Sequence, residues 1–209
     1  MARQTRQRIL DASLMMFNAQ GEPNVTTNHI ADELEISPGN LYYHFRNKDD
    51  IIEQLFARFE ERMDAALSAP QGRLPGLEDI WLQLHLVFEC IWDYRFLYRD
   101  LVDILSRNRH LRLRFARILK RAAGNASEVM RGMVRAGAMR ASAAEIDGTA
   151  TNILVIATFW MNYASARGDK DERASIRDGI VQVMMLLAPF LRDAERVHLN
   201  TLTRAYTAA

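Results

Sequence analysis

The chain has 209 residues and a mass of 24.0 kDa, with 49% hydrophobic and 25% charged residues. This length and apolar content suit one domain with a sizeable core, or a small module joined to a larger one, and they exclude a wholly disordered chain. The 27 basic and 26 acidic residues leave a formal charge of +1. Nucleic-acid binding would therefore depend on the local placement of charge rather than on the overall balance.

The single cysteine, Cys90, excludes an intrachain disulfide and a cysteine-based zinc site, which fits a reducing compartment. Residues 1–8 are polar and basic and are not followed by the apolar run of a secretory signal. The longest apolar runs, 153–161 and 183–190, are too short to cross a bilayer. We therefore expect a cytoplasmic protein with no membrane partner.

Apolar residues recur at helical spacing along the chain, and no stretch alternates as a half-buried strand would, so the predicted fold class is all-α. The first helix carries Ile9 and Phe17 on its core face and Asn18 off that face, and it ends before Gly21. A hydroxyl among residues 26–28 can cap the second helix.

A very short third helix begins at Ser37-Pro38, because the serine accepts from an unpaired N–H and proline in the first turn loses no hydrogen bond. A fourth extends to about residue 67, where a Pro/Gly/Ser-rich break spans 68–75. We place the boundary between a helix-turn-helix domain, 1–50, and a second helical domain, 51–209, inside this fourth helix. Further helices are predicted at 76–92, 95–106, 108–139, 143–167 and 172–193, followed by a polar tail.

The first three helices form a helix-turn-helix pattern whose third helix is too short to bury much surface. Leu41 and Phe45 can face the core together, which leaves an unusual polar and aromatic set for the surface. Asparagine can pair with an adenine edge, tyrosine offers a ring to thymine methyl groups and an O–H to phosphate, and glycine permits close approach. These properties favour double-stranded DNA as the partner of the surface set, which comprises Gly39, Asn40, Tyr42, Tyr43 and His44.

Positive charge occurs where the DNA backbone would run, with Arg3, Arg6 and Arg8 ahead of the first helix and Arg46 and Lys48 after the third. Residues 1–48 nevertheless hold five basic and five acidic side chains. We therefore expect a few directed contacts, doubled in a dimer, rather than a strongly basic surface.

The order of these residues resembles the DNA-binding domain of the TetR family of transcriptional repressors. The similarity covers about the first sixty residues, and the remainder agrees in length and number of helices. The matching positions are Thr5-Arg6-Gln7-Arg8-Ile9-Leu10-Asp11-Ala12, Phe17, Gly21, Val25-Thr26-Thr27, Ile30-Ala31, Leu34, Ile36-Ser37-Pro38-Gly39-Asn40-Leu41-Tyr42-Tyr43-His44-Phe45 and Asn47-Lys48.

The resemblance implies a homodimer whose N-terminal domains enter successive major grooves, and a C-terminal domain that binds a small molecule and dimerises through its last two helices. It further implies that Thr27 contacts a phosphate and Asn28 a base. Thr27 and Ser37 are also expected to cap their helices, which is compatible with phosphate contact at a helix N-terminus. The other positions implied are Gly39, Asn40 and Tyr42 on the recognition surface and Tyr43, His44 and Lys48 in a phosphate clamp.

One position departs from the family pattern, because Glu35 stands where the turn between the second and third helices usually has glycine. A left-handed backbone there costs a residue with a side chain roughly 1 kcal/mol. We expect the turn to be slightly reshaped in consequence.

The aromatic and methionine side chains of the C-terminal region could form a filled core or line a cavity for an apolar effector. Because the resemblance to the TetR family implies a ligand-binding domain, we favour a pocket among the helices at 76–92, 95–106, 108–139 and 143–167. His85, Asn125 and Asn152 are its candidate polar contacts. Its other candidate residues are Trp81, Phe88, Trp92, Phe96, Met130, Met133, Phe159, Trp160 and Tyr163.

The helix at 143–167 is apolar nearly all round and must be covered on both sides. A second copy of the chain would supply one covering in a two-fold interface, whereas a monomer would need another helix there. The residues predicted for this interface are Ile153, Ile156, Trp160, Ile180, Met184, Leu187 and Leu191.

An enzyme and a ligand carrier are the two alternatives to DNA-dependent regulation. The five histidines show no metal spacing, and the chain has no phosphate loop and no nucleophile elbow, so we expect neither an enzyme nor a cofactor or metal site. An all-helical ligand carrier would share the C-terminal half and differ only in the role of the surface set. The basic run 107–121 is interpreted as the solvent side of a helix with Leu111, Phe115 and Ile118 in the core.

Overall fold

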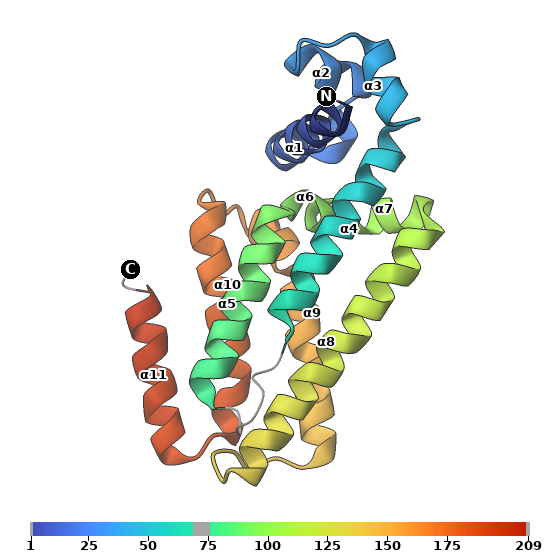
Figure 1. The fold of residues 1–209 in the computed structure, drawn as a ribbon. Helices are drawn as coiled ribbons and strands as arrows, with labels where there is room; N and C mark the ends of the chain where they lie inside the picture. Colours follow the sequence, from blue (N-terminus) through green and yellow to red (C-terminus); the bar gives the residue numbers. More distant parts are fainter. Residues whose placement is uncertain (1, 69–75, 208–209) are drawn as a thin grey trace. The chain divides into compact units, whose positions relative to one another are not determined.

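The computed structural model describes residues 2–68 and 76–207, and within them the chain is helical without a strand, which confirms the all-α prediction (Figure 1). The predicted break at 68–75 falls almost wholly outside the described residues. No helix in the described part is both long and apolar enough to span a membrane. The chain divides into two compact units, the first containing residues up to Arg62 together with Asp93–Arg114, and the second containing Met63–Trp92 and the chain from Phe115 onward.

The first unit packs the N-terminal helices around a core that includes Ile9, Phe17, Leu41 and Phe59, all with 0% exposure. The rings of Phe17 and Phe96 lie 5.3 Å apart. Its elements are α1 (Ala2–Gln20), the short helix η1 (Glu22–Asn24), α2 (Thr27–Glu33), α3 (Pro38–His44), the first part of α4 (Lys48–Ala66), α6 (Arg95–Arg99), α7 (Leu101–Arg107) and the start of α8 (Arg109–Arg135).

The second unit is a helical bundle in which α9 and α10 pack along one another (Figure 1). Phe88, Met133, Val183 and Leu187 form part of its core, each with 0% exposure. Its elements are the remainder of α4 and α8, α5 (Leu77–Asp93), α9 (Ala143–Arg167), α10 (Glu172–Leu187), the short helix η2 (Ala188–Phe190) and α11 (Asp193–Thr207).

The helix α9 has the predicted bounds, and Ser142 starts it with a capping box in which its hydroxyl accepts from the Glu145 N–H. The predicted helix 95–106 is instead two helices separated at Asp100. The predicted helix 108–139 ends earlier, because Gly137 takes a left-handed φ of 75° and the Ala138 N–H bonds back to the Met133 carbonyl.

The predicted polar tail is wrong, because residues 193–207 form α11 and the preceding helix stops near Pro189. Leu199 is fully buried, and Leu202, Thr203 and Tyr206 are partly buried on the same face. These positions follow the spacing of an amphipathic helix, so the signal was present in the sequence. The threonines and other residues of modest helix propensity make it weak.

Close packing around Gly179 holds α5, α9 and α10 together in the second unit. A Cβ at this position would lie 2.6 Å from Cε1 of Phe88 and 2.7 Å from Cδ1 of Trp160. The Trp160 indole N–H donates to the Ser175 carbonyl at 2.6 Å, which fixes the ring against α10. A residue without a side chain is therefore required at Gly179.

The basic run at the start of α8 is the solvent side of an amphipathic helix, as predicted. Leu111, Phe115 and Ile118 are buried at 1–3% exposure. Arg114 pairs with Glu60 at 2.7 Å within the first unit, and most of the other arginines of the run are exposed. These observations give the basic run a structural role.

The prediction that Asn18 lies off the core face of the first helix is wrong, because its side chain is buried. Its side-chain amide donates to the Asp93 carbonyl at 2.8 Å, and its side-chain oxygen accepts from the Phe96 N–H at 3.1 Å. An asparagine on the core face is tolerated here because it satisfies the backbone groups at the start of α6.

Candidate nucleic-acid interface and cavities

The helix α3 presents most of its polar and aromatic residues to solvent. Leu41 and Phe45 are buried at 0% and 3% exposure, whereas Tyr42 and Tyr43 are 48% and 79% exposed. Gly39 and Asn40 are exposed as well, and His44 is half-buried with its ring 5.1 Å from that of Tyr43. The short helix is therefore anchored by two apolar side chains and exposes the face expected from the sequence.

The caps of α2 and α3 hold this face in place. Ser37 caps α3, as predicted, by accepting from the Asn40 N–H at 3.2 Å. The cap of α2 is Thr26 and not Thr27, because the helix begins at Thr27, one residue earlier than a Thr27 cap requires. The Thr27 hydroxyl instead lies 3.0 Å from the Tyr42 hydroxyl, which links the start of α2 to α3. Asn28 lies beside this pair and is exposed.

The turn between α2 and α3 keeps the left-handed geometry normally made by glycine, so the expected reshaping does not occur. Glu35 has a φ of 53°, and no other non-glycine residue in the described chain has a positive φ. The Ile36 N–H bonds to the Ala31 carbonyl and the Glu35 N–H to the Asp32 carbonyl, each at 3.0 Å. This pair of bonds closes a Schellman motif, which fixes the direction in which α3 leaves the turn.

The basic side chains predicted ahead of the first helix lie on it, because α1 already begins at Ala2. Arg3 and Arg8 are exposed, whereas the Arg6 guanidinium lies 4.9 Å from the centre of the Phe45 ring. This cation–π contact occupies Arg6 at the end of α3. Arg46 is exposed immediately after α3, so the free positive charge of the interface is small, as the sequence indicated.

Lys48 is engaged in a buried ion-pair network centred on Glu22. The Lys48 Nζ lies 2.8 Å from Oε1 of Glu22 and donates to the carbonyls of Glu22 and Val25 at 3.0 Å each. Arg107 of α7 reaches the other oxygen of the Glu22 carboxylate at 2.6 Å, and that carboxylate has 0% exposure. The Glu22 N–H donates to Oδ2 of Asp100 at 3.1 Å. Burial raises the pKa of Asp100, with the negative charge of Glu22 adding to the shift.

This network ties η1 and the start of α4 to α7 inside one unit. Lys48, predicted for the phosphate clamp, therefore positions the N-terminus of α4 through three oxygen contacts. A short helix, capped, anchored and braced in this way, can hold amide, phenol and imidazole groups against the edges and phosphates of a DNA groove.

The residues predicted for one effector pocket are distributed over several places. Phe88, Phe96 and Met133 have 0% exposure and are core residues, with Phe96 in the first unit. The Asn125 side chain donates to the Leu67 carbonyl at 2.8 Å, and Asn152 is exposed. No one cavity of the described residues is lined by all of them, because some are core residues, Asn125 bonds the backbone and Asn152 is exposed.

The space enclosed by α5, α8, α9 and α10, which includes Met130 in its lining, is only about 50 Å³. A drug-sized ligand needs roughly 300 Å³ or more. The centre of the bundle is therefore filled by side chains, as the alternative interpretation of the sequence allowed.

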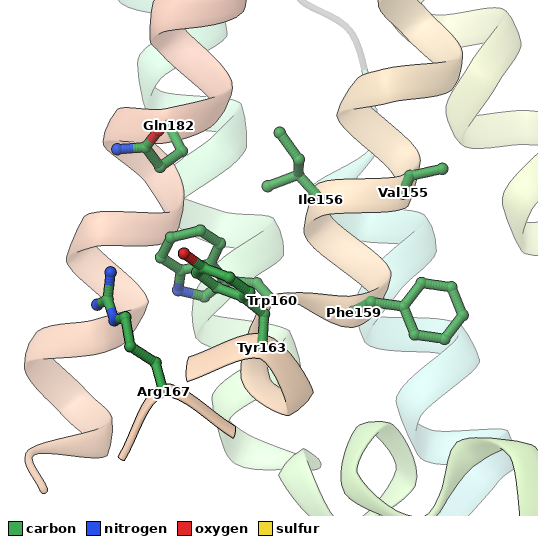
Figure 2. Close-up of a pocket in the computed structure, with 7 residues that line it drawn as sticks. All are labelled: Val155, Ile156, Phe159, Trp160, Tyr163, Arg167 and Gln182. Carbon is green, nitrogen blue, oxygen red and sulfur yellow. The ribbon is translucent and has the colours of Figure 1, made fainter. Parts of the chain in front are cut away.

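A second cavity, of about 410 Å³, lies between α9 and α10 and is shown in Figure 2. Trp160 and Tyr163 overlap in this view, with Arg167 and Gln182 nearby, while Phe159 points to the opposite side of α9. This cavity opens on a surface where Val155, Phe159 and Tyr163 are about half exposed.

The residues predicted for the dimer interface lie mostly inside the protomer. Trp160, Ile180, Met184, Leu187 and Leu191 are at most 7% exposed, so they offer little surface to a second copy. Ile153 and Ile156 are partly exposed. The exposed apolar face consists instead of Val155, Phe159 and Tyr163 on α9 and Met185 on α10, with exposures of 45–55%. We call these four residues the α9–α10 face.

A third cavity, of about 610 Å³, lies between α5, α10 and α11. His85 and Trp92, both predicted for the effector pocket, line it, and Trp81 stacks on His85 with ring centres 5.8 Å apart. Tyr206 could not be predicted for this cavity because α11 was expected to be a polar tail, and the charged residues of α10 that line it have the pattern of an ordinary solvent face. No cluster of metal-ligating side chains occurs among the residues that the structure describes.

A capped and braced recognition helix joined to a helical bundle defines the chain as a helix-turn-helix transcriptional regulator. The comparisons with known proteins agree. The family model described as bacterial regulatory proteins of the tetR family matches residues 9–55, and the model described as bacterial transcriptional repressor matches residues 58–199. The chain belongs to the TetR family of transcriptional regulators.

The individual relatives support this assignment to different extents. A solved TetR-family regulator from Marinobacter aquaeolei VT8 has 36% identity, a TM-score of 0.89 and coverage of 97% of this chain and 98% of its own. The regulator TtgW of Pseudomonas putida is 41% identical over 71 residues, which cover 34% of this chain and 53% of TtgW. A complex of SmeT with triclosan shares the fold, with 21% identity, a TM-score of 0.61 and coverage of 92% and 94%.

The family consists of DNA-binding regulators rather than enzymes. The regulator function is therefore established at this level, and the alternative of a carrier without DNA binding is set aside. The match with TtgW spans about half of that protein's length, so nothing further about its activity is transferred.

Proposed function

We propose that the chain is a repressor that binds a near-palindromic operator as a homodimer and leaves it when a small effector binds. The exposed face of α3 is the observation that carries the proposal. A tyrosine with 79% exposure and a neighbour with 48% on a seven-residue helix contribute little to the core and suit contact with a partner. In this proposal Asn28, Asn40 and Tyr42 read bases, Thr27, Tyr43 and His44 contact phosphates, and Lys48 holds the start of α4 in place through Glu22.

Binding selection from fragmented genomic DNA tests the DNA-binding step. The wild-type protein should enrich a near-palindromic site whose half-sites are about one duplex turn apart, roughly 34–36 Å. Tyr42→Ala should weaken binding to the enriched site by removing preference at particular base pairs, with about a tenfold change for one lost base contact. Leu82→Ala on α5, where the side chain is 51% exposed, is the control and should bind as wild type does. No enrichment at modest ionic strength would overturn the proposal.

The α9–α10 face supports a homodimer. A second copy packed on this face would bury four large apolar side chains of two adjacent helices, as a two-fold interface requires. Sedimentation at micromolar concentration should give twice the chain mass of 24.0 kDa. Phe159→Glu should shift the mass to that of the monomer, whereas Val197→Glu on α11, at a position 66% exposed, should not. A wild-type protein that sediments as a monomer contradicts the dimer.

Effector release would follow from a shift between two populations of the dimer. An effector that binds the state with badly spaced recognition helices more tightly lowers operator affinity by the ratio of its two affinities. The buried network around Glu22 supports this step, because a displacement of α7 would be transmitted through Arg107 to Lys48 and the start of α4. An unchanged operator affinity in effector-saturated protein would contradict it.

A further inference from the structure

The cavity between α5, α10 and α11 lies wholly within the second unit and is distinct from the filled centre of the bundle. Its volume of about 610 Å³ falls within the range of small-molecule sites, roughly 300–1,000 Å³. His85, Glu89 and Trp92 lie at successive turns of α5 and form one wall. Arg177 of α10 and Tyr206 of α11 form others.

An aromatic cluster makes one wall flat and well supported. Trp81 stacks on His85 with an angle of 10° between the rings, and Tyr206 meets Trp81 edge-on at 5.6 Å. The Tyr206 hydroxyl lies 3.2 Å from Nδ1 of His85. Burial raises the pKa of Tyr206, and the negative charge of Glu89 adds to this, so the phenol stays protonated at neutral pH. The wall therefore offers an apolar surface and a neutral hydroxyl.

The charged groups of the cavity are satisfied except at one position. Glu89 pairs with Arg173 at 3.3 Å, and the Arg173 guanidinium lies 5.6 Å from the centre of the Trp92 ring. The Asp171 carboxylate accepts from the N–H groups of Arg173 and Ala174 at the start of α10. Arg177, which is partly buried, has no ion pair or hydrogen bond within the described part of the chain.

A partly buried guanidinium without a counter-charge has lost hydration without compensation, so an anion that reaches it is favoured. The planar fork of arginine suits a carboxylate, which can accept two hydrogen bonds at once. A cationic ligand is disfavoured, because Arg173 already occupies the face of Trp92 and neutralises Glu89. A purely apolar ligand would bury Arg177 further and leave it unpaired.

We propose that this cavity binds a small aromatic carboxylic acid, whose carboxylate pairs with Arg177 and whose ring lies against the wall formed by His85 and Tyr206. The site stands on its own geometry. Only the effect of the ligand on DNA binding rests on the proposed function. That effect would pass through α10, because its first turns line the cavity and its later residue Met185 belongs to the α9–α10 face.

Calorimetry with 2-naphthoate and its neutral isostere 2-naphthamide tests the binding site. Naphthoate should bind the wild-type protein with a Kd of about 1 mM or lower and at least about tenfold more tightly than the amide. Arg177→Gln should lower the affinity for naphthoate to that for the amide, and Arg177→Lys should retain part of it. Arg131→Gln, on the surface of α8 in an ion pair with Asp147, is the matched control and should bind as wild type does.

Thermal denaturation of each variant shows whether it folds. If Arg177→Gln does not fold, Arg177→Lys replaces it as the test variant. The absence of saturable binding, or equal affinity for naphthoate in wild type and a folded Arg177→Gln, overturns the proposed site. Operator binding is measured separately with the selected DNA fragment. Naphthoate should weaken operator binding of the wild type and not of Arg177→Gln. Calorimetric binding without any effect on DNA would retain the site and refute only its role in release.

Discussion

Replacement of Lys48 by methionine should destabilise the first unit, because Glu22 would lose one of its two counter-charges. The Glu22 carboxylate has 0% exposure, and its oxygens lie 2.8 Å from Lys48 and 2.6 Å from Arg107. Removal of one partner of a buried pair costs about 3–5 kcal/mol. Arg107 remains in place and the Lys48 side chain is 23% exposed, so we expect about 2–3 kcal/mol here. Part of this cost comes from the carbonyls of Glu22 and Val25, which lose a donor.

A double-mutant cycle isolates the ion pair from these other losses. Lys48→Met should cost less in a Glu22→Gln background, with a coupling free energy of about 1–3 kcal/mol. Hydrogen exchange of the amides in the first unit gives the free energies of local opening without requiring the two units to unfold together. Arg58→Met and Asp11→Asn provide a matched cycle at a pair 2.9 Å apart in which Asp11 is 59% exposed. Its coupling should be at most about 0.5 kcal/mol.

A coupling at Glu22–Lys48 as small as that of the exposed pair would refute the reasoning. It would mean that the pair does not persist in solution and that the Lys48 ammonium is available to neutralise a phosphate. The salt dependence of operator binding would then lose about one unit of slope in Lys48→Met.

Two backbone predictions concern stability and are measured by thermal denaturation. Glu35→Gly should stabilise the protein by up to about 1 kcal/mol, because glycine has no penalty at a φ of 53°, whereas Glu35→Ala should give no such gain. Gly179→Ala should destabilise by about 1–3 kcal/mol through contact with Phe88 and Trp160. Gly124→Ala, where nothing lies within 4 Å of the added Cβ, should stabilise by up to about 1 kcal/mol. Equal changes in stability for Gly179→Ala and Gly124→Ala would contradict the packing argument.

Features governed by local chemistry could be predicted from the sequence. Ser37-Pro38 predicted the start of α3, and the capping box at Ser142 lies at the start of α9, whose predicted bounds were correct. The division of α3 into buried Leu41 and exposed neighbours followed from helical spacing alone. In each case the decisive interaction spans at most four residues, so the sequence contains both partners.

Features that depend on distant partners could not be predicted in this way. Asn18 resembles a surface residue until α6 is placed beside it, 78 residues further along the chain at Phe96. The network of Glu22 likewise joins η1 to Arg107, 85 residues away. Nothing in the local sequence shows that the glutamate at the start of η1 is fully buried.

The predicted effector and dimer residues differ from the residues that line the cavities and the exposed apolar face for one common physical reason. The helix α9 is apolar nearly all round, so its sequence indicates that two faces are covered but not which face lies inside the protomer. Trp160 is predicted from the sequence for both the effector pocket and the dimer interface, yet Gly179 admits its indole against α10, and Val155 and Phe159 lie at the surface. The same contact helps to fill the centre of the bundle. An effector must then either separate packed helices, at the cost of the contacts that Trp160 makes, or bind where the helices leave space. The cavity under α11 requires no such opening, which favours Arg177 over the core as the place where ligand binding begins.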